Sequence, residues 1–532
     1  MKKINYKSDI IVISFILIIS VFIALIMGMH RYGDSVSYCA MADSLIKDGD
    51  LIVDNKDLTR WNRGKPTDLP VGAYITVDSS GVMKYSKPIL YPLLAAPFVF
   101  FGFGGIILLN GLFLGGIVAI NYFFARKYFS VNISLAMAGL FVFCSFMPVY
   151  SAWMTPDIML FFACCLCIWL GIYEKKPGLA AFIIGIVSSA KIMFLLLLVP
   201  LFAVFLANRE IRKIFKIAGI CVLGMAGMFL LNFLFLRQFS VYSGVRGYFF
   251  IKAPQYLNLD LVKNNLIVVV SQFDGFNFNS LGLFIRNLVN FFIGRFTGVV
   301  WYAFPVFVSV FVYLFYRENV SRAEKTIGDS ILIITTVLAI ALIFFRPLNY
   351  FGGRGFVCNR YFFILPALFF LPSFRLIKKP AKIALFFLPG LLISAQLIKN
   401  QIFTKNFVLE QGKYLYPYAF VKHVRDFPLK YAPLEICQIE SFAVPSINIS
   451  ENISLYSPLG QRIRLNQRIQ LDKEQEIVII QTGKTGSLRL EVVPEEIVLQ
   501  PDVILKNRRG LGSKSFYYFK AKLPVWIKDI HG

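Results

Sequence analysis

The residues of this chain that could do acid–base chemistry stand next to apolar segments. Asp34 follows the apolar stretch DIIVISFILIISVFIALIMGM within the sequence RYGD, and Asp157 follows a proline in WMTPDIM. A carboxylate can accept a proton from an attacking hydroxyl or amine, so either aspartate could act as a general base. Ionisable side chains at membrane depth are costly, and several that converge on one face indicate a polar cavity that uses them. We therefore predict Asp34 and Asp157 as catalytic residues.

Basic side chains that could bind a phosphate accompany these aspartates. Lys87 lies in YSKPILYP and Lys191 lies in SSAKIMF, each beside an apolar segment. Arg354 and Arg360 lie together in GGRGFVCNRYF. Arginine neutralises a phosphate through paired hydrogen bonds, and lysine does so as a point charge. We predict that these four residues bind the phosphate of a donor at the membrane boundary.

Each of these residues also has a structural interpretation, which stays open. Asp34 could cap a helix at the interface, and Asp157 could favour the dipole at a helix start. Lys191 could extend its ammonium group to the interface, and Arg360 could anchor the start of a helix there.

The remaining acidic and aromatic residues of the first loop receive other interpretations. The later carboxylates are interpreted as the solvated face and cap of a loop helix; they are Asp43, Asp48, Asp50 and Asp54. Tyr85 and Tyr91 could stack on a sugar. The three histidines are too scattered for a metal site, so no metal ligand is predicted. Asp34 with Asp157 could still begin an ion site, which leaves a divalent metal open as a cofactor.

The composition indicates a membrane protein with many spans. The chain has 532 residues, of which 57% are hydrophobic and 16% are charged. Apolar runs of about 20 residues recur along it, which is the length that a bilayer core requires. The formal net charge of +25 could indicate nucleic-acid binding, but basic residues in short loops between spans are the ordinary signal of topology. We therefore predict the lipid bilayer as a partner, and no nucleic acid.

About eleven apolar segments predict an all-α polytopic transmembrane domain over residues 1–400. The candidate spans are residues 9–29, 104–124, 131–149, 157–173, 178–190, 192–207, 215–236, 297–316, 327–345, 360–374 and 382–398. The first run is longer than the apolar region of a signal peptide, so we expect it to be retained. A shorter apolar stretch at 88–101 contains three prolines and is predicted to be an interfacial or re-entrant helix.

Short basic loops define the predicted topology. They are residues 125–127, 174–176, 208–216, 316–325 and 374–382, and all fall on one side of the predicted spans. The positive-inside rule assigns that side to the cytoplasm. The N-terminus is then cytoplasmic, while the loop 30–87, the segment 237–296 and everything after residue 400 lie outside the plasma (inner) membrane. The candidate site residues share this outer face.

The composition changes after residue 400. Alternating stretches such as EIVIIQT (476–482), SLRLEVV (487–493) and KSFYYFKAKL (514–523) are separated by turn residues. This alternation is typical of short strands. We predict a small extracytoplasmic β-rich domain over residues 401–532.

Several motifs resemble those of the GT-C superfamily of polytopic glycosyltransferases. GDSVSYCAMADSLIKDGDL (33–51) resembles the first-loop signature in which an aspartate just after the first span is the catalytic carboxylate. TPDIMLFF (155–162) resembles the segment that bears a second luminal aspartate, and SSAKIMFLLLLVP (188–200) resembles a T-K-x-x-x-L-L-x-P stretch. The resemblance covers residues up to about 380 and implies a GT-C-like fold.

One motif departs from the family pattern. SKPILYPLLAAPF (86–98) resembles the K-P-P-L-x-Y-W stretch of protein O-mannosyltransferase-like and lipid A aminoarabinose transferase-like members. It has Ile89 in place of the second proline and Pro92 in place of the tryptophan. The resemblance implies a polyprenyl-phosphate-linked sugar as donor and inversion at the anomeric carbon, and it implies no particular extracytoplasmic acceptor.

Three functions are compatible with these patterns. The first is an integral membrane glycosyltransferase that moves a monosaccharide from a polyprenyl phosphate to an extracytoplasmic glycan, lipid or protein. The second is a transporter or flippase for lipid-linked sugars. Such a protein would place charged residues near the bilayer midplane, on broken helices in repeated halves. The third is a scaffold that presents the β-rich domain, which leaves the acidic loop 30–87 without a purpose. We favour the glycosyltransferase.

Overall fold

The computed structural model describes most of the helical part of the chain and short strands near its end. The described residues are 6–29, 34–63, 73–77, 81–237, 246–249, 266–269, 281–294, 297–345, 350, 358–371, 380–403, 437–439, 453–457, 475–482, 487–492, 506–509, 514–521 and 525–530. The chain divides into two compact units. The first contains residues 1–272, 303–336 and 363–405, and the second contains residues 273–302, 337–362 and 406–532.

Four of the described helices are long and apolar enough to cross a membrane. They are α1 (Tyr6–Met27), α5 (Gly104–Arg126), α11 (Ile211–Leu236) and α16 (Arg322–Phe345). Each coincides with a span predicted from the sequence. Their length and composition support a multi-pass membrane protein.

Most of the other predicted spans are occupied by shorter helices, so the number eleven stays a prediction. The shorter apolar helices of the first unit are α6 (Val131–Phe143), α7 (Met147–Ser151), α8 (Asp157–Ile168), α9 (Pro177–Ser188), α10 (Leu198–Ala207) and α15 (Phe304–Tyr316). The last predicted span coincides with α17 (Pro380–Phe403), which has 24 residues. A π-helical turn, η3 (Trp169–Tyr173), extends α8, and a 3-10 helix, η4 (Ile192–Leu197), precedes α10.

The predicted span at residues 360–374 is not a continuous α-helix in its described part. Residues 360–371 contain turns and one 3-10 helix, η7 (Leu365–Phe370). Pro366 lies in the first turn of η7. Proline has no amide hydrogen, so an α-helix entering from the preceding residues would lose a hydrogen bond there.

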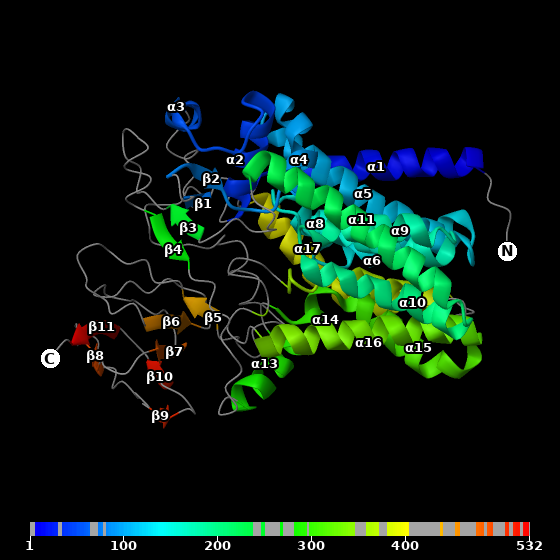
Figure 1. Ribbon diagram of the computed structural model, residues 1–532. Helices are drawn as coiled ribbons and strands as arrows, with labels where there is room; N and C mark the ends of the chain where they lie inside the picture. Colours follow the sequence, from blue (N-terminus) through cyan, green and yellow to red (C-terminus); the bar gives the residue numbers. More distant parts are fainter. Residues whose placement is uncertain are drawn as a thin grey trace. The chain divides into compact units, whose positions relative to one another are not determined.

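Close contacts fix α1 against α5, which lie side by side (Figure 1). A Cβ atom on Gly111 would lie 2.7 Å from the Cα of Val21, so the backbones approach too closely for a larger residue. At one end of the pair, Arg126 Nε donates to Asp9 Oδ1 at 3.2 Å, and the Tyr122 hydroxyl donates to the same oxygen. Small residues and buried polar contacts are how helices associate in a bilayer.

The first loop folds into helices and strands that pack on the ends of the spans. It contains α2 (Asp34–Lys47), α3 (Asn55–Arg63), β1 (Ala73–Val77) and β2 (Met83–Tyr85). The stretch 88–101 follows as α4 (Leu90–Ala95) and a 3-10 helix, η2 (Ala96–Phe101), both of which contact α2. Two short helices agree with the expectation that 88–101 does not span.

A four-stranded antiparallel sheet joins this loop to a later one. Its strand order is β2-β1-β3-β4, with β3 (Arg246–Phe249) and β4 (Leu266–Val269) from the segment 237–296 (Figure 1). Tyr74 of β1 is opposite Tyr248 of β3. Segments that share a sheet lie on the same side of the spans, which is what the predicted topology requires of these two.

In its described residues the second unit contains α13 (Leu281–Ile293), α14 (Val299–Tyr302), the end of α16 and strands of the C-terminal region. The strands are β5 (Cys437–Ile439), β6 (Ile453–Ser457), β7 (Gln475–Thr482), β8 (Ser487–Val492), β9 (Lys506–Arg509), β10 (Lys514–Ala521) and β11 (Val525–Ile530). They form a sheet of order β5-β6-β7-β10-β9 and a pair, β11-β8. The three stretches singled out by their alternation coincide with β7, β8 and β10. That they belong to a separate extracytoplasmic domain beginning at residue 401 stays a prediction.

Candidate functional site

The end of β2 is held from both sides by backbone hydrogen bonds. The Val53 amide donates to the Met83 carbonyl at 2.9 Å, and the Tyr85 amide donates to the Leu51 carbonyl at 3.1 Å. On the other edge, β1 pairs with β2 in antiparallel register. These bonds fix the direction in which the chain leaves β2 toward Lys87.

Lys87 and Asp34 form an ion pair at this position. The Lys87 Nζ atom lies 2.8 Å from Asp34 Oδ1 and 3.8 Å from the centroid of the Tyr74 ring. Tyr74 is held in turn, because its amide donates to the Ser37 hydroxyl at 2.8 Å. The side chains of Lys87 and Asp34 are 9% and 16% exposed. The pair is therefore desolvated in part but still accessible.

Asp157 forms a second ion pair, with Lys191. The Lys191 Nζ atom lies 3.7 Å from Asp157 Oδ1, and the Thr155 hydroxyl donates to Asp157 Oδ2 at 2.7 Å. Asp157 is the first residue of α8, and its side chain is only 3% exposed. Lys191 lies in the segment between α9 and η4. The roles predicted for Asp157 in catalysis and for Lys191 in phosphate binding stay predictions.

Aromatic contacts and side-chain hydrogen bonds connect the Asp34–Lys87 pair with the segment before Asp157. Tyr38, one turn after Asp34 in α2, packs edge-on against Tyr91 with ring centroids 5.5 Å apart. The Tyr91 hydroxyl donates to Asn110 Oδ1 at 2.9 Å, and the Asn110 amide donates to the Trp153 carbonyl at 2.7 Å. The Cys39 Sγ atom also lies 3.3 Å from Met154 Sδ. The start of α2 is thus fastened to the segment that leads into Asp157.

The structure places the other predicted site residues differently. The rings of Tyr85 and Tyr91 are fully buried, and their hydroxyls are bonded to Asp57 and Asn110. The contacts that they make are within the protein, so stacking on a sugar stays an untested prediction.

The two predicted arginines stay untested as phosphate ligands. Arg360 is half-buried, belongs to the second unit and lies 5.4 Å from the ring of its neighbour Tyr361. Arg354 lies outside the described residues. Their binding to a donor phosphate therefore stays a prediction.

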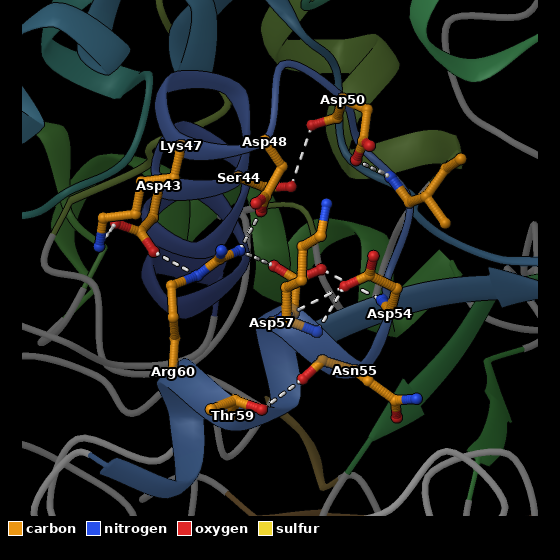
Figure 2. A network of polar contacts seen from close by, with 12 residues as sticks. Asp43, Ser44, Lys47, Asp48, Asp50, Asp54, Asn55, Asp57, Thr59 and Arg60 are labelled. Atoms are coloured by element: carbon orange, nitrogen blue, oxygen red, sulfur yellow. Dashed lines mark hydrogen bonds and ion pairs between the residues drawn. The ribbon is translucent and has the colours of Figure 1, made fainter.

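A cluster of charges around Arg60 was not predicted (Figure 2). Arg60 of α3 pairs with Asp57 at 2.5 Å, with Asp43 of α2 at 3.1 Å, and with Asp48. Asp43 also pairs with Lys47 at 2.6 Å. We call these five residues the Arg60 cluster.

The Arg60 cluster corrects the interpretation of Asp43 and Asp48 as a solvated face. Their side chains are only 10% and 9% exposed, because α3 folds back over α2 and places Arg60 against them. Asp54 does cap α3, accepting from the amides of Lys56 and Asp57. The i,i+3 spacing of Asp57 and Arg60 was the one local signal in the sequence, since such residues are neighbours on a helix.

Within the Arg60 cluster, burial has the largest effect on the pKa of Asp57. Burial raises the pKa of the Asp57 carboxyl from 3.8 to about 6, although the Asp54 amide, Arg60 and the Tyr85 hydroxyl all favour the ionised form. The pKa of the Tyr85 hydroxyl is also raised, first by burial and then by the negative Asp57. The carboxylates keep the Arg60 guanidinium charged, with its pKa above the usual range despite burial.

The described residues offer little to a divalent cation. They contain no group of three or more histidine, cysteine, aspartate and glutamate side chains that could hold a metal. Each candidate catalytic aspartate faces a lysine ammonium group, which would repel a second cation.

Comparisons with known proteins give one similar fold among solved structures. No protein-family model and no curated protein sequence matches the chain. The crystal structure of ArnT from Cupriavidus metallidurans bound to undecaprenyl phosphate is similar at 13% identity and a TM-score of 0.45. The match covers 78% of this chain and 70% of that one.

Proposed function

We propose that this protein is an inverting membrane glycosyltransferase that uses a polyprenyl-phosphate-linked sugar. The observation that carries the proposal is the accessible Asp34–Lys87 pair, in which Lys87 Nζ lies 2.8 Å from Asp34 Oδ1 at the start of α2. A base and a phosphate-binding cation are thus adjacent in a loop that follows directly on a span. The donor phosphate of a lipid-linked sugar lies at such a boundary while its tail stays in hydrocarbon.

The pair can take part in both halves of the transfer. A donor phosphate competes with Asp34 for the Lys87 ammonium group, and this competition releases the carboxylate. The acceptor hydroxyl or amine then attacks the anomeric carbon, a new bond to the sugar forms, and the sugar–phosphate bond breaks. The polyprenyl phosphate leaves with the bonding electrons and remains opposite Lys87, and Asp34 accepts the acceptor proton.

Asp157 and Lys191 serve as a supporting pair in this proposal. The burial of Asp157 and the hydrogen bond from Thr155 restrict the movement of its carboxylate. We propose that this pair orients the donor from the protein side, with Arg354 and Arg360 as further candidates for phosphate binding. The acceptor and the sugar are left open, and the proposed location is the outer face of the plasma (inner) membrane.

The position of the charges disfavours a transporter or flippase. Asp34 and Asp157 are the first residues of their helices, and Lys87 and Lys191 lie in connecting segments. Transporters that alternate access bind their substrates near the bilayer midplane, at breaks within helices. Charges at the ends of helices suit a reaction at one interface.

The test is sugar transfer by the Asp34→Asn variant. The substitution keeps the size of the side chain but removes the base, so turnover should fall by about 100-fold or more while donor binding is retained. The measurement is transfer from a radiolabelled polyprenyl-phosphate sugar by purified protein. Asp50→Asn is the matched control, because Asp50 lies in the same loop and its carboxylate accepts a hydrogen bond from the nearby Ile52 amide. Near-normal turnover by Asp34→Asn would show that the carboxylate is only a helix cap.

A further inference from the structure

We propose that Arg60 and Asp57 are positioning residues that hold Lys87 in place by fixing the end of β2. The consequence for sugar transfer rests on the function proposed above, whereas the consequence for Lys87 itself does not. Neither residue touches Lys87. They act through Tyr85, which lies two residues before it.

Arg60 joins three parts of the first loop through ion pairs. Its guanidinium group contacts Asp43 within α2, Asp48 after α2 and Asp57 within α3 (Figure 2). The Arg60 side chain is 20% exposed and that of Asp57 is 2% exposed. Lys47 supplies the second positive charge, on Asp43. One arginine therefore fixes α3 relative to α2.

Asp57 connects Arg60 to strand β2 through Tyr85. Its Oδ1 atom accepts from Arg60 and also from the Tyr85 hydroxyl at 3.1 Å. Its Oδ2 atom accepts from the Asp54 amide at 3.2 Å, and Asp54 caps the same helix in return. The carboxylate is held on both oxygens, so the Tyr85 hydroxyl has a fixed partner.

Tyr85 is the last residue of β2, and the chain from there to Lys87 is short. Ser86 is held by its amide, which donates to the Tyr74 carbonyl at 3.1 Å. Tyr74 also provides the ring beneath the Lys87 ammonium group. If the Tyr85 anchor is lost, the end of β2 can shift and the contacts of Lys87 with Asp34 and Tyr74 weaken together.

The chain provides a matched control at a distant place in the same unit. Arg317 donates from two of its nitrogens to Asp329, at 2.7 and 2.6 Å, and the Tyr313 hydroxyl donates to Asp329 at 2.9 Å. This arginine, aspartate and tyrosine repeat the chemistry of Arg60, Asp57 and Tyr85. They join α15 to α16 and have no link to β2 in the described residues.

The experiment compares Arg60→Gln with Arg317→Gln, and Tyr85→Phe with Tyr313→Phe. The phenylalanine variants remove one hydroxyl and keep the ion pairs, so they remain informative if an arginine variant does not fold. The first readout is the rate at which an amine-reactive reagent labels Lys87 in the detergent-purified protein, with the exposed Lys213 as internal reference. Arg60→Gln and Tyr85→Phe should speed labelling of Lys87 by about threefold or more through local opening. The Arg317 and Tyr313 variants should leave it unchanged.

The second readout is the kinetics of sugar transfer. A misplaced Lys87 weakens donor binding, so KM for the donor should rise by about tenfold in Arg60→Gln and Tyr85→Phe, with kcat reduced less. A purely structural cluster would instead lower the fraction of active enzyme and leave KM unchanged. Unchanged Lys87 labelling in both β2-linked variants would overturn the positioning role. Faster labelling of Lys87 in a protein that transfers no sugar would support positioning and reject the proposed function.

Discussion

Both candidate catalytic aspartates pair with a lysine, and their exposure distinguishes their roles. The Asp34 side chain is 16% exposed and that of Asp157 is 3% exposed. An accessible carboxylate can meet an acceptor that arrives from water, whereas the buried one meets only groups already in the site. Asp57 has a third environment, in which burial outweighs its hydrogen bonds and raises its pKa to about 6.

The raised pKa of Asp57 predicts how stability depends on pH. Between about pH 4 and pH 6 the folded protein keeps the Asp57 proton while the unfolded chain releases it, so the free energy of unfolding falls as pH rises and levels off above pH 6. Asp57→Asn should remove this part of the pH dependence, on the order of 2 kcal/mol. The measurement is thermal unfolding in detergent at pH 4.5 and pH 7, for the wild type and Asp57→Asn. An identical pH dependence in the two proteins would show that Asp57 ionises normally.

At the scale of elements, the proposed catalytic residues lie at helix ends, and the packing lies on helix faces. Asp34 and Asp157 begin α2 and α8, while the long helices contact each other through glycines. Between α9 and α11, a Cβ atom on Gly185 would collide with the Cys221 carbonyl oxygen and lie 3.0 Å from the Met225 nitrogen. The obstacle is backbone, which cannot rotate away as a side chain can.

The close approach of α9 and α11 predicts a strong effect of one methyl group. Gly185→Ala should lower the free energy of unfolding by about 1–3 kcal/mol, because the helices must separate to accommodate it. Gly227→Ala in α11 is the control, since a Cβ atom there has nothing within 4 Å, and it should be neutral or slightly stabilising. Thermal unfolding of the purified variants in detergent measures both. Equal stability of the two variants would contradict the close packing.

At the scale of the whole molecule, backbone pairing links two loops that lie far apart in the sequence. The sheet β2-β1-β3-β4 combines the loop 30–87 with the segment 237–296. The predicted topology puts the basic loops on the opposite side of the spans. A site on one face requires the loop 30–87 and the segment 237–296 to lie on that face and the basic loops to lie on the other.

This arrangement predicts the outcome of reporter fusions. Fusions after Lys176, Lys213 and Lys325 should report the cytoplasm, because those residues lie in the basic loops. Fusions after residue 400 should report the outside, in agreement with an extracytoplasmic C-terminal region. A cytoplasmic signal from the fusions after residue 400 would place the C-terminal strands on the side opposite the proposed site.

The sequence by itself determined the membrane class, the positions of the long helices and the stretches that form strands. These properties follow from runs and alternations of apolar residues, which are local and can be read along the chain. α1, α5, α11 and α16 each coincide with a predicted span, and β7 and β10 with predicted strands. The departure at residues 360–371 arises where proline interrupts an apolar run.

Only the tertiary structure decided which charges meet. Lys87 and Asp34 are 53 positions apart, and nothing in either local sequence specifies that they pair at 2.8 Å. Asp43 and Asp48 have the spacing and polarity of a solvated face, yet α3 covers them with Arg60. Tyr85 and Tyr91 are aromatic residues of a kind that can stack on a sugar. In the structure they are buried, and their hydroxyls are bonded inside the protein. Periodicity determines whether a segment is a helix or a strand, whereas burial and ion pairing depend on the segments that fold against it.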